Sequence, residues 1–300
     1  MQIPGGPGTA RAESGSRTIP QKTTFFKLSS IDRQRHCGYN GAGLPGESHS
    51  MSTDLTPAQW DEQFTRQAGW TRPTRHHLYR RANLLRAERV LDVGSGTGIV
   101  TAELAGQTRG RVIGLDLDPE MVAYARQEHG QAEYRVGDAH DMDFASASFD
   151  VTACHFLLLW CRDPKQAAAE MVRVTRPGGS VLVCAEPDYG GRLDHPELPL
   201  CRWQIEALRG EGADPCLGRK LRALFLQPGA REVEVGVMPG VWEPARLRAE
   251  FEAEWSLWQR TLGDEVPPAE LARVKAADLA ATESGERLVF LPVFYALVRT

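Results

Sequence analysis

Residues 90–98 read Val-Leu-Asp-Val-Gly-Ser-Gly-Thr-Gly, a short apolar run that passes into three alternating glycines. Residues 89–93 predict a buried parallel strand, and the glycines after it predict a turn. From Ile99 onward the sequence favours a helix. A strand, a glycine turn and a helix in this order bring bare backbone N–H groups and a helix N-terminus against a ligand. The segment therefore predicts a ligand site at the end of a strand.

The glycine spacing and one acidic residue indicate the kind of ligand. A dinucleotide fingerprint, Gly-x-Gly-x-x-Gly, needs its third glycine where this chain has Ile99. Asp92 would also repel a pyrophosphate, whereas it suits a ligand that carries an ammonium group and a sulfonium. Here the chain resembles the class I S-adenosylmethionine (SAM)-dependent methyltransferases, whose first motif is an acidic residue followed by Gly-x-Gly-x-Gly.

The motifs that follow keep the order of that family. A second predicted strand, residues 111–115, ends at Asp116, one strand–helix unit beyond the glycines. A carboxylate at that place can accept hydrogen bonds from both ribose hydroxyls. A third predicted strand, residues 132–136, runs toward Asp138, where the family places an acidic group near the adenine amine.

Two further strands complete the series. Residues 149–156 predict a fourth strand, and Asp163-Pro164 predicts the start of a helix. The Arg-Pro-Gly-Gly run at 176–179 is expected to end that helix before a fifth strand at 180–185. The motifs together cover residues 88–187 without a gap.

The resemblance implies a fold class and a cofactor. The fold would be α/β, with a doubly wound, mostly parallel sheet, an antiparallel C-terminal strand pair, and helical insertions at both ends. SAM would be bound with Asp92 at its methionine end, Asp116 on the ribose and Asp138 at the adenine. The predicted cofactor residues are Asp92, Gly94, Ser95, Gly96, Gly98, Asp116, Leu117, Met121, Asp138 and Ala139.

The chain is expected to divide into a tail and one domain. Residues 1–50 are rich in glycine and lack apolar periodicity, which predicts a disordered tail or an extension ahead of a natural start at Met51. Residues 51–300 would form the methyltransferase domain. Its parts are a helical cap (55–87), the SAM-binding core (88–187), a substrate loop with helices (188–230), and C-terminal strands (231–300) with a helical insertion at 244–283.

The segment before the core predicts two helices. Thr56, followed by Gln59 three positions later, forms a capping-box pattern. One helix would carry Trp60 and the other Leu78. The many basic residues at 56–86 either bind phosphate or nucleic acid, or simply face solvent, as charged residues on helices usually do.

The loop after the fifth strand is the predicted substrate site. Loops at the carboxyl ends of parallel strands line the ligand crevice, and residues 186–196 hold many polar groups. Tyr189 is the first candidate for a catalytic base and His195 the second. Arg192 is a candidate substrate ligand. The alternative is a turn-rich connection in which Asp194 caps the next helix.

Three residues outside this loop are further candidates. His155, just past the fourth strand, is either a third candidate base or a hydrogen-bonded core residue. Trp203 and Arg219 could bind an anionic group of the substrate, although Arg219 would equally fit the exposed first turn of a helix. Trp160 stands where many relatives have the histidine of Leu-Glu-His-Leu, so no histidine role is carried over there.

The C-terminal part predicts two strands, at 231–239 and 293–299, for the antiparallel pair. Between them, residues 244–260 and 268–282 predict amphipathic helices with much aromatic bulk. This insertion would form either a lid over a hydrophobic substrate or the surface of a homodimer.

Composition limits the remaining functions. A chain of 300 residues with 42% hydrophobic residues can bury a sizeable core, and a net charge of −4 argues against nucleic-acid binding. The longest apolar stretch, residues 151–161, is far shorter than the ~18 residues of a membrane span. No basic-then-apolar leader is present, which predicts a cytoplasmic protein.

The six cysteines show no Cys-x-x-Cys pair, so neither a metal site nor the cluster of radical-SAM enzymes is expected. Cys154 and Cys184 fall in predicted strands and are expected to be inert core residues.

The sequence thus predicts a SAM-dependent methyltransferase that acts on a small molecule and resembles the group of ubiquinone and menaquinone biosynthesis enzymes. The acceptor atom, whether O, N or C, stays open. One alternative is a SAM-binding regulator or accessory subunit that transfers nothing. Another is an RNA or protein methyltransferase, which the acidic net charge and the aromatic insertion disfavour.

Overall fold

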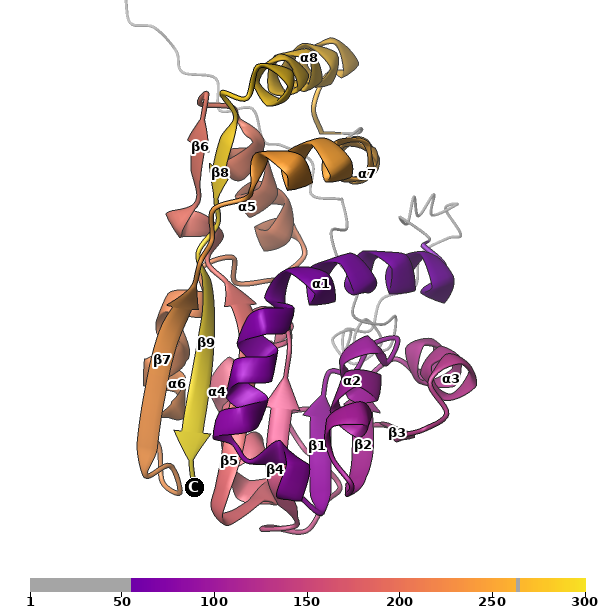
Figure 1. Cartoon of the computed structure of the whole chain (residues 1–300), viewed down its shortest axis with the longest axis vertical. Coiled ribbons are helices and arrows are strands. Elements are labelled where there is room, and N and C mark those ends of the chain that lie inside the picture. Colours follow the sequence, from indigo (N-terminus) through magenta and orange to yellow (C-terminus); the bar gives the residue numbers. More distant parts are fainter. Residues whose placement is uncertain (1–54, 263–264) are drawn as a thin grey trace, which may run out of the picture.

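The computed structural model describes residues 55–262 and 265–300. The predicted tail at 1–50 and the alternative start at Met51 lie outside these residues. The described chain is arranged in two tiers (Figure 1): a sheet with helices on both faces, and a smaller layer beyond one end of that sheet. The parallel strands point toward the smaller tier, so a site at their carboxyl ends lies between the two tiers.

The large sheet has seven strands in the order β3-β2-β1-β4-β5-β9-β7. Their bounds are β1 (Arg89–Val93), β2 (Arg111–Asp116), β3 (Glu133–Val136), β4 (Phe149–Cys154), β5 (Thr175–Pro187), β7 (Glu232–Met238) and β9 (Val293–Arg299). The first five strands pair in parallel, and β9 lies antiparallel between β5 and β7. The predicted fold class is confirmed.

Helices cover both faces of this sheet. They are α1 (Pro57–Arg81), α2 (Ile99–Gln107), α3 (Pro119–Glu128), α4 (Pro164–Val174) and α6 (Leu221–Phe225). Alternate residues of each strand enter different cores: in β1, Val90 packs with α1 and α2, whereas Leu91 and Val93 pack with α4 and α6. Burial on both faces is the reason that the central strands read as continuous apolar runs.

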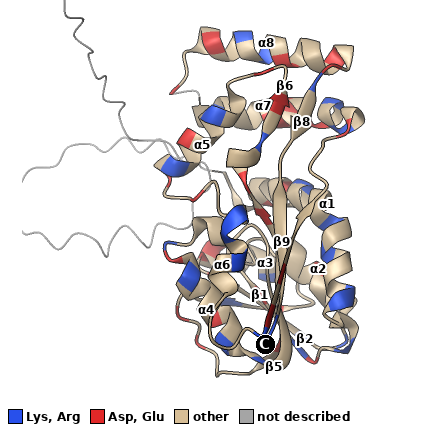
Figure 2. Cartoon of the chain, turned by 90° about the vertical axis from the view of Figure 1, so that its left-hand side faces the viewer, with Lys and Arg blue, Asp and Glu red and all other residues tan. Residues whose placement is uncertain are grey.

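The smaller tier holds α5 (Leu200–Gly210), α7 (Pro244–Leu262) and α8 (Pro268–Ser284), beside a two-stranded sheet of β6 (Leu193–His195) and β8 (Leu288–Phe290). The helices predicted in the insertion are confirmed as α7 and α8. Their core is largely aromatic, with Trp203 of α5 packed among Phe251, Trp255 and Trp258 of α7. Figure 2 shows basic and acidic residues interspersed on both tiers. No described helix is long and apolar enough to cross a membrane.

The N-terminal prediction of two helices was wrong, because α1 is one helix from Pro57 to Arg81 with Pro73 inside it. Figure 1 shows α1 bent into two arms. An internal proline lacks an N–H and crowds the preceding turn, which kinks a helix without having to end it. The capping box is confirmed: the Gln59 N–H donates to the Thr56 hydroxyl at 3.4 Å, and the Thr56 N–H donates to the Gln59 side chain at 2.9 Å.

Two predicted strand boundaries were also wrong. Residues 176–179 belong to β5 instead of ending α4, because the C-terminal residue pairs with them: the Gly178 N–H donates to the Thr300 carbonyl at 2.7 Å. Strand β4 stops at Cys154, before Phe156, whose φ of 52° turns the chain out of the sheet. The suggested capping role of Asp194 also fails, since this residue lies in β6.

A buried arginine fixes α1 on the sheet domain. The side chain of Arg75 is 1% exposed and donates to both carboxylate oxygens of Glu103 on α2, at 2.9 and 2.7 Å. It also donates to the Ala68 carbonyl at 2.7 Å and to the hydroxyl of Thr71. The guanidinium therefore bridges the bent region of α1 to α2.

We expect Arg75→Ala to lower the free energy of unfolding by about 3 kcal/mol, because it leaves the partly buried Glu103 carboxylate without its counterion. Arg72→Ala, at an exposed position on the same helix, is the matched control and should change stability by less than about 0.5 kcal/mol. Urea unfolding followed by circular dichroism measures both. Equal stability of the two variants would contradict this role of Arg75.

Candidate functional site

A pocket opens where β1, β2 and β4 end, covered by the first arm of α1. We call it the glycine-loop pocket. Its lining residues are Trp60, Phe64, Gln67, Asp92, Gly94, Ser95, Gly96, Thr97, Ile99, Val100, Asp116, Asp118, Met121, His155, Phe156, Leu157, Leu159, Trp160 and Tyr189. The segment that the sequence singled out thus forms one wall of a real concavity.

At two of the three motif glycines, a neighbouring side chain in this wall leaves too little room for a Cβ. Both Gly94 and Gly96 have positive φ, 74° and 52°. A Cβ on Gly94 would lie 2.7 Å from the Leu157 side chain, and one on Gly96 would lie 3.0 Å from the Phe64 ring. Gly98 serves packing instead, because its Cβ would meet the Tyr134 hydroxyl at 2.7 Å, away from the pocket.

Asp92 presents a buried carboxylate to the glycine-loop pocket. It is 1% exposed and accepts a hydrogen bond from the Thr101 hydroxyl at 2.6 Å. It forms no ion pair within the described part of the chain. Burial raises the pKa of Asp92 to about 7, although the Thr101 hydrogen bond opposes the shift. A cationic ligand would relieve the cost of burying this charge.

Asp116 ties the end of β2 to the glycine loop. One of its carboxylate oxygens accepts the Gly96 N–H at 2.7 Å and the other accepts the Asp118 N–H at 3.0 Å. Burial raises the pKa of Asp116, and these two N–H groups oppose the shift. Each oxygen has a further lone pair for a hydroxyl donor in the pocket.

The pocket also contains hydroxyl groups without partners. Within the described residues, the buried side-chain oxygens of Ser95 and Thr97 have no hydrogen-bond partner, and both residues line the pocket. Buried polar atoms normally have partners. Two orphaned hydroxyls beside two carboxylates therefore fit a polar ligand with several donors and acceptors, such as SAM.

The predicted cofactor residues fall into two groups. Those that line the pocket are Asp92, Gly94, Ser95, Gly96, Asp116 and Met121, whereas Gly98, Leu117, Asp138 and Ala139 do not line it. The side chain of Asp138 is 43% exposed and lies 2.6 Å from Nδ1 of His140. The adenine contact of Asp138 stays a prediction.

Sequence reasoning missed Glu186, which organises the opposite wall of the pocket. Its fully buried carboxylate accepts the backbone N–H groups of Leu157 at 2.9 Å, Leu158 at 2.6 Å and Leu159 at 3.3 Å. Burial raises the pKa of Glu186 to about 8, although these three N–H groups oppose the shift. The sequence signal was present as an acidic residue at the end of an otherwise apolar strand.

A second cavity lies beside the first, between α1 and the smaller tier. We call it the tryptophan cavity. Its lining residues are Gln63, Gln67, Trp70, Tyr189, Arg192, Leu200, Gln204, Trp242, Leu247, Glu250, Phe251, Glu254, Trp255, Leu257, Trp258, Asp278, Thr282, Arg287, Val289 and Leu291. Gln67 and Tyr189 line both cavities. The two therefore meet at these side chains.

Tyr189 and His155 are brought to the site as predicted, but their chemistry differs from that of a base. Burial raises the pKa of Tyr189, so its phenol stays protonated and can donate a hydrogen bond. Burial and the charge of Arg75 lower the pKa of His155, which is therefore neutral. Nε2 of His155 lies 2.8 Å from the Thr71 hydroxyl, which connects it to the Arg75 network.

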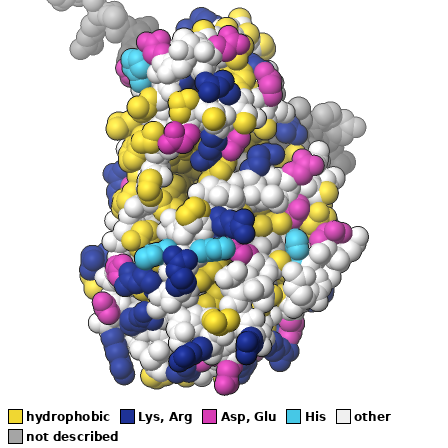
Figure 3. Space-filling view, in the orientation of Figure 1, with side chains coloured by type: hydrophobic (Ala, Val, Ile, Leu, Met, Phe, Trp, Pro, Cys, Tyr) yellow, Lys and Arg dark blue, Asp and Glu magenta, His cyan; other side chains and the backbone are white. Residues whose placement is uncertain are grey.

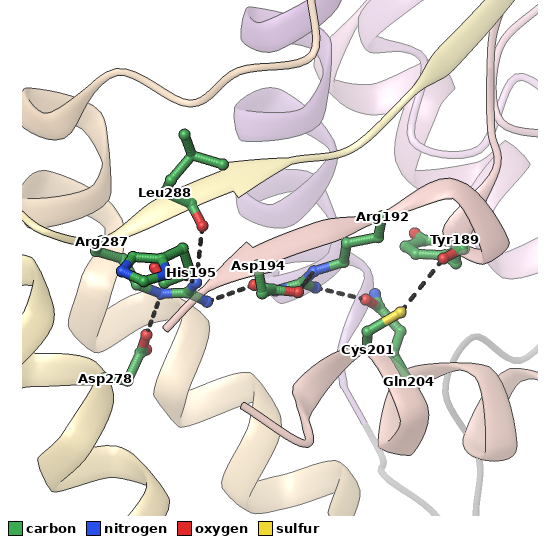
Figure 4. A network of polar contacts seen from close by, with 9 residues as sticks. All are labelled: Tyr189, Arg192, Asp194, His195, Cys201, Gln204, Asp278, Arg287 and Leu288. Atoms are coloured by element: carbon green, nitrogen blue, oxygen red, sulfur yellow. Dashed lines mark hydrogen bonds and ion pairs between the residues drawn. The ribbon is translucent and has the colours of Figure 1, made fainter. Parts of the chain in front are cut away.

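Arg192 also reaches the tryptophan cavity, but its guanidinium is already bound. It donates to both oxygens of Asp194, at 2.8 and 3.0 Å, and to the Gln204 side chain at 3.0 Å (Figure 4). Arg287 approaches Asp194 from the other side at 2.6 Å. Two arginines thus share one carboxylate, and neither is free to bind an anion.

The structure does not bring the other three candidates to either cavity. His195 lies on β6 with its side chain 64% exposed, 3.4 Å from Glu286. Trp203 is buried in the core of the smaller tier. Arg219 forms an ion pair with Asp188 and is not among the residues that line either cavity. The interpretation of Trp203 and Arg219 as an anion site therefore has no geometric support, and His195, the second candidate base, lines neither cavity.

No group of three or more His, Cys, Asp or Glu residues in the described ranges is arranged to hold a metal ion. Cys154 and Cys184 lie in the core, and burial raises the pKa of both thiols. They behave as small apolar residues.

Comparisons with known proteins agree with this geometry. Residues 91–183 match the family described as "Methyltransferase domain". The chain is 43% identical over 97 residues to the biotin biosynthesis bifunctional protein BioHC of Cellvibrio japonicus, which covers 32% of this chain and 19% of that protein. It is 32% identical over 148 residues to a demethylmenaquinone methyltransferase of Renibacterium salmoninarum, which covers 49% of this chain and 62% of the relative. The chain thus spans less than two thirds of the length of these relatives.

A solved structure of Haemonchus contortus phosphoethanolamine N-methyltransferase 2, in complex with phosphomonomethylethanolamine and S-adenosylhomocysteine, has a similar fold. The TM-score is 0.52 at 18% identity, over 83% of this chain and 54% of that one. The strand order of the sheet and the glycine-loop pocket at the carboxyl ends of its strands agree with the match of residues 91–183 to a methyltransferase domain. This match over residues 91–183 confirms the resemblance drawn from the motifs.

The raised pKa of Glu186 has a measurable consequence. Because its pKa is about 8 in the fold, against 4.5 for an ordinary glutamate, the stability it contributes is complete below pH 4.5 and is lost as the pH rises through 8. Glu186→Gln removes this titration. The stability of wild type relative to Glu186→Gln should therefore fall between pH 5 and 9, by up to about 4 kcal/mol. Urea unfolding at a series of pH values measures it, and a pH-independent difference would contradict it.

Proposed function

We propose that this protein transfers a methyl group from SAM, bound in the glycine-loop pocket, to a small molecule bound in the tryptophan cavity. The observation that carries the proposal is the junction of the two cavities at Gln67 and Tyr189. A methyl donor and an acceptor bound on either side of such a junction would face each other. Alignment and exclusion of water are the main contributions an enzyme makes to this reaction.

Residues of this chain would hold the two ends of the cofactor. SAM, when bound, supplies a methyl group on a positively charged sulfur. Asp92 is placed to bind its cationic methionine end, and Asp116 to accept hydrogen bonds from its ribose. The backbone of Gly94 and Gly96 allows close approach. Trp60, on the first arm of α1, covers the pocket and excludes water.

The residues at the junction would orient the acceptor. The protonated phenol of Tyr189 and the amide of Gln67 can both donate hydrogen bonds to it. The neutral imidazole of His155 lines the glycine-loop pocket and is oriented by the Thr71 hydroxyl.

Two alternatives are weaker. A regulator that only binds SAM would not need a second, aromatic cavity that opens onto the cofactor site. An RNA methyltransferase would need a basic surface, whereas the whole chain has a net charge of −4 and Figure 2 shows mixed charges on both tiers. The small-molecule acceptor is therefore favoured.

The first test is binding of S-adenosylhomocysteine. We expect Asp116→Ala to weaken it by about 1.5–3 kcal/mol, roughly tenfold to a hundredfold, because charge-assisted hydrogen bonds to the ribose are lost. Asp143→Ala, at an exposed position, is the control and should leave affinity unchanged. Calorimetry measures affinity, and a thermal melt verifies that each variant is folded. Equal affinities for wild type and Asp116→Ala would exclude the ribose contact.

The second test uses the pKa of Asp92, about 7 in the free protein. A cationic ligand binds the ionised carboxylate better, so SAM affinity should fall as the pH drops below about 7, with a slope that approaches tenfold per pH unit. Asp92→Asn should bind SAM weakly and lose this dependence. Calorimetry between pH 5.5 and 8 measures it. Affinity that stays flat over this range in wild type would show that Asp92 does not face the charged end of SAM.

A further inference from the structure

Aromatic side chains are prominent in the lining of the tryptophan cavity. Its aromatic residues are Trp70, Tyr189, Trp242, Phe251, Trp255 and Trp258. Figure 3 shows hydrophobic side chains around a hollow on the face between α1 and the smaller tier. Ring faces attract both apolar bodies and cations, because the π-electron cloud is negative.

The charges that line this cavity are nearly all paired. The pairs are Asp278 with Arg287, Glu250 with Arg246, and Arg192 with Asp194. The remaining acceptors are also used: Trp255 Nε1 donates to Asp278 at 2.7 Å, and Trp70 Nε1 donates to Glu250 at 3.1 Å. An anionic acceptor would therefore find no free guanidinium in the lining.

Glu254 is the exception among these groups. It lies on α7, one turn after Glu250, and forms no hydrogen bond or ion pair with another residue in the described ranges. The charges that face it are Glu250, Asp278, Arg66, Arg192, Arg246 and Arg287. Burial raises the pKa of Glu254 to about 7, Glu250 adds to the shift, and Arg192 opposes it. The carboxylate can therefore take up and release a proton near neutral pH.

We propose that the tryptophan cavity binds a small organic ammonium ion with an apolar body, and that Glu254 is its counterion and accepts its proton. This inference rests on the proposed methyl transfer and names the acceptor class. A cation is already held by rings in the same wall: Cζ of Arg246 lies 4.4 Å from the ring centre of Trp70 and 3.8 Å from that of Trp242. The free carboxylate beside further ring faces is suited to a second cation.

The reaction is balanced with these groups alone. The ammonium gives one proton to the Glu254 carboxylate and becomes a neutral amine with a lone pair. That lone pair forms a bond to the methyl carbon of SAM, while the carbon–sulfur bond breaks and its electron pair stays on sulfur. The products are a methylated ammonium ion and S-adenosylhomocysteine, and the Glu254 proton is returned to solvent.

The test compares ligands that share a body and differ in charge. The amines are phenethylamine and tryptamine, the neutral isosteres are phenethyl alcohol and tryptophol, and the anions are phenylacetate and indoleacetate. Calorimetry at pH 7.5 with saturating S-adenosylhomocysteine measures their affinity for the full chain. We expect each amine to bind at least about tenfold more tightly than its alcohol, and the anions to bind most weakly. Incubation with SAM should yield the N-methylated amine, detected by mass spectrometry.

Substitutions on α7 test whether Glu254 is responsible for the preference for amines. Glu254→Gln should lose the preference for amines and the N-methylation, while its affinity for S-adenosylhomocysteine stays unchanged. Glu252→Gln on the same helix, where the side chain is 77% exposed, should keep both. Thermal melts verify folding, and Glu254→Asp, which keeps the charge, should retain part of the preference.

The outcomes separate this inference from the proposed function. A protein that does not bind S-adenosylhomocysteine would overturn the proposed function itself. Normal cofactor binding with equal or tighter binding of the alcohols or the anions would overturn the ammonium site alone. Amine binding that survives in Glu254→Gln, or bound amines that are never methylated, would overturn the role of Glu254.

Discussion

The buried carboxylate of Glu186 holds together the two strand ends on which both cavities depend. Through three backbone N–H groups it fixes residues 157–159 after β4, and Leu157 in turn packs against Gly94. Tyr189 follows Glu186 by three residues, just after β5 ends, and lies at the junction of the two cavities. A carboxyl group buried without a cation is costly, and backbone N–H groups compensate it only in part. The cost of burying Glu186 therefore arises where β4 and β5 end, which is where the walls of the two cavities must be rigid.

Helix α1 forms part of the wall of both cavities. Its first arm covers the glycine-loop pocket with Trp60 and borders the tryptophan cavity with Trp70. The two arms would be free to shift relative to the sheet if α1 were held by apolar contacts alone. Arg75 prevents this, because its directional hydrogen bonds fix α1 to α2 at the bend. The hydrogen bond from Arg75 to Thr71, and the one between Thr71 and His155, extend this network to the glycine-loop pocket.

The sequence predicted most of the sheet domain and the helices α7 and α8 of the smaller tier, but few of the side-chain contacts that shape the two cavities, for a physical reason. The glycine loop, Asp92 and Asp116 belong to local motifs, in which spacing along the chain determines spacing in the fold. Glu186 acts on residues 157–159, which are far away in the sequence, and Glu254 is brought to the tryptophan cavity by tertiary packing. No periodicity reveals either placement. The loop at 186–196 was interpreted as functional because it is polar. In the fold its own acids, Asp188 and Asp194, bind the nearby arginines, so most of that polarity stabilises the loop.

Asp92, which is buried, lines the glycine-loop pocket, and Glu254, which is half-buried, lines the tryptophan cavity; neither forms an ion pair among the described residues. Burial raises the pKa of both groups, so each ionises less readily than an exposed acid does. A cation arriving on either side draws the nearest carboxyl group into its ionised form. This arrangement explains why uncompensated acids persist in a site whose other charges are so completely paired.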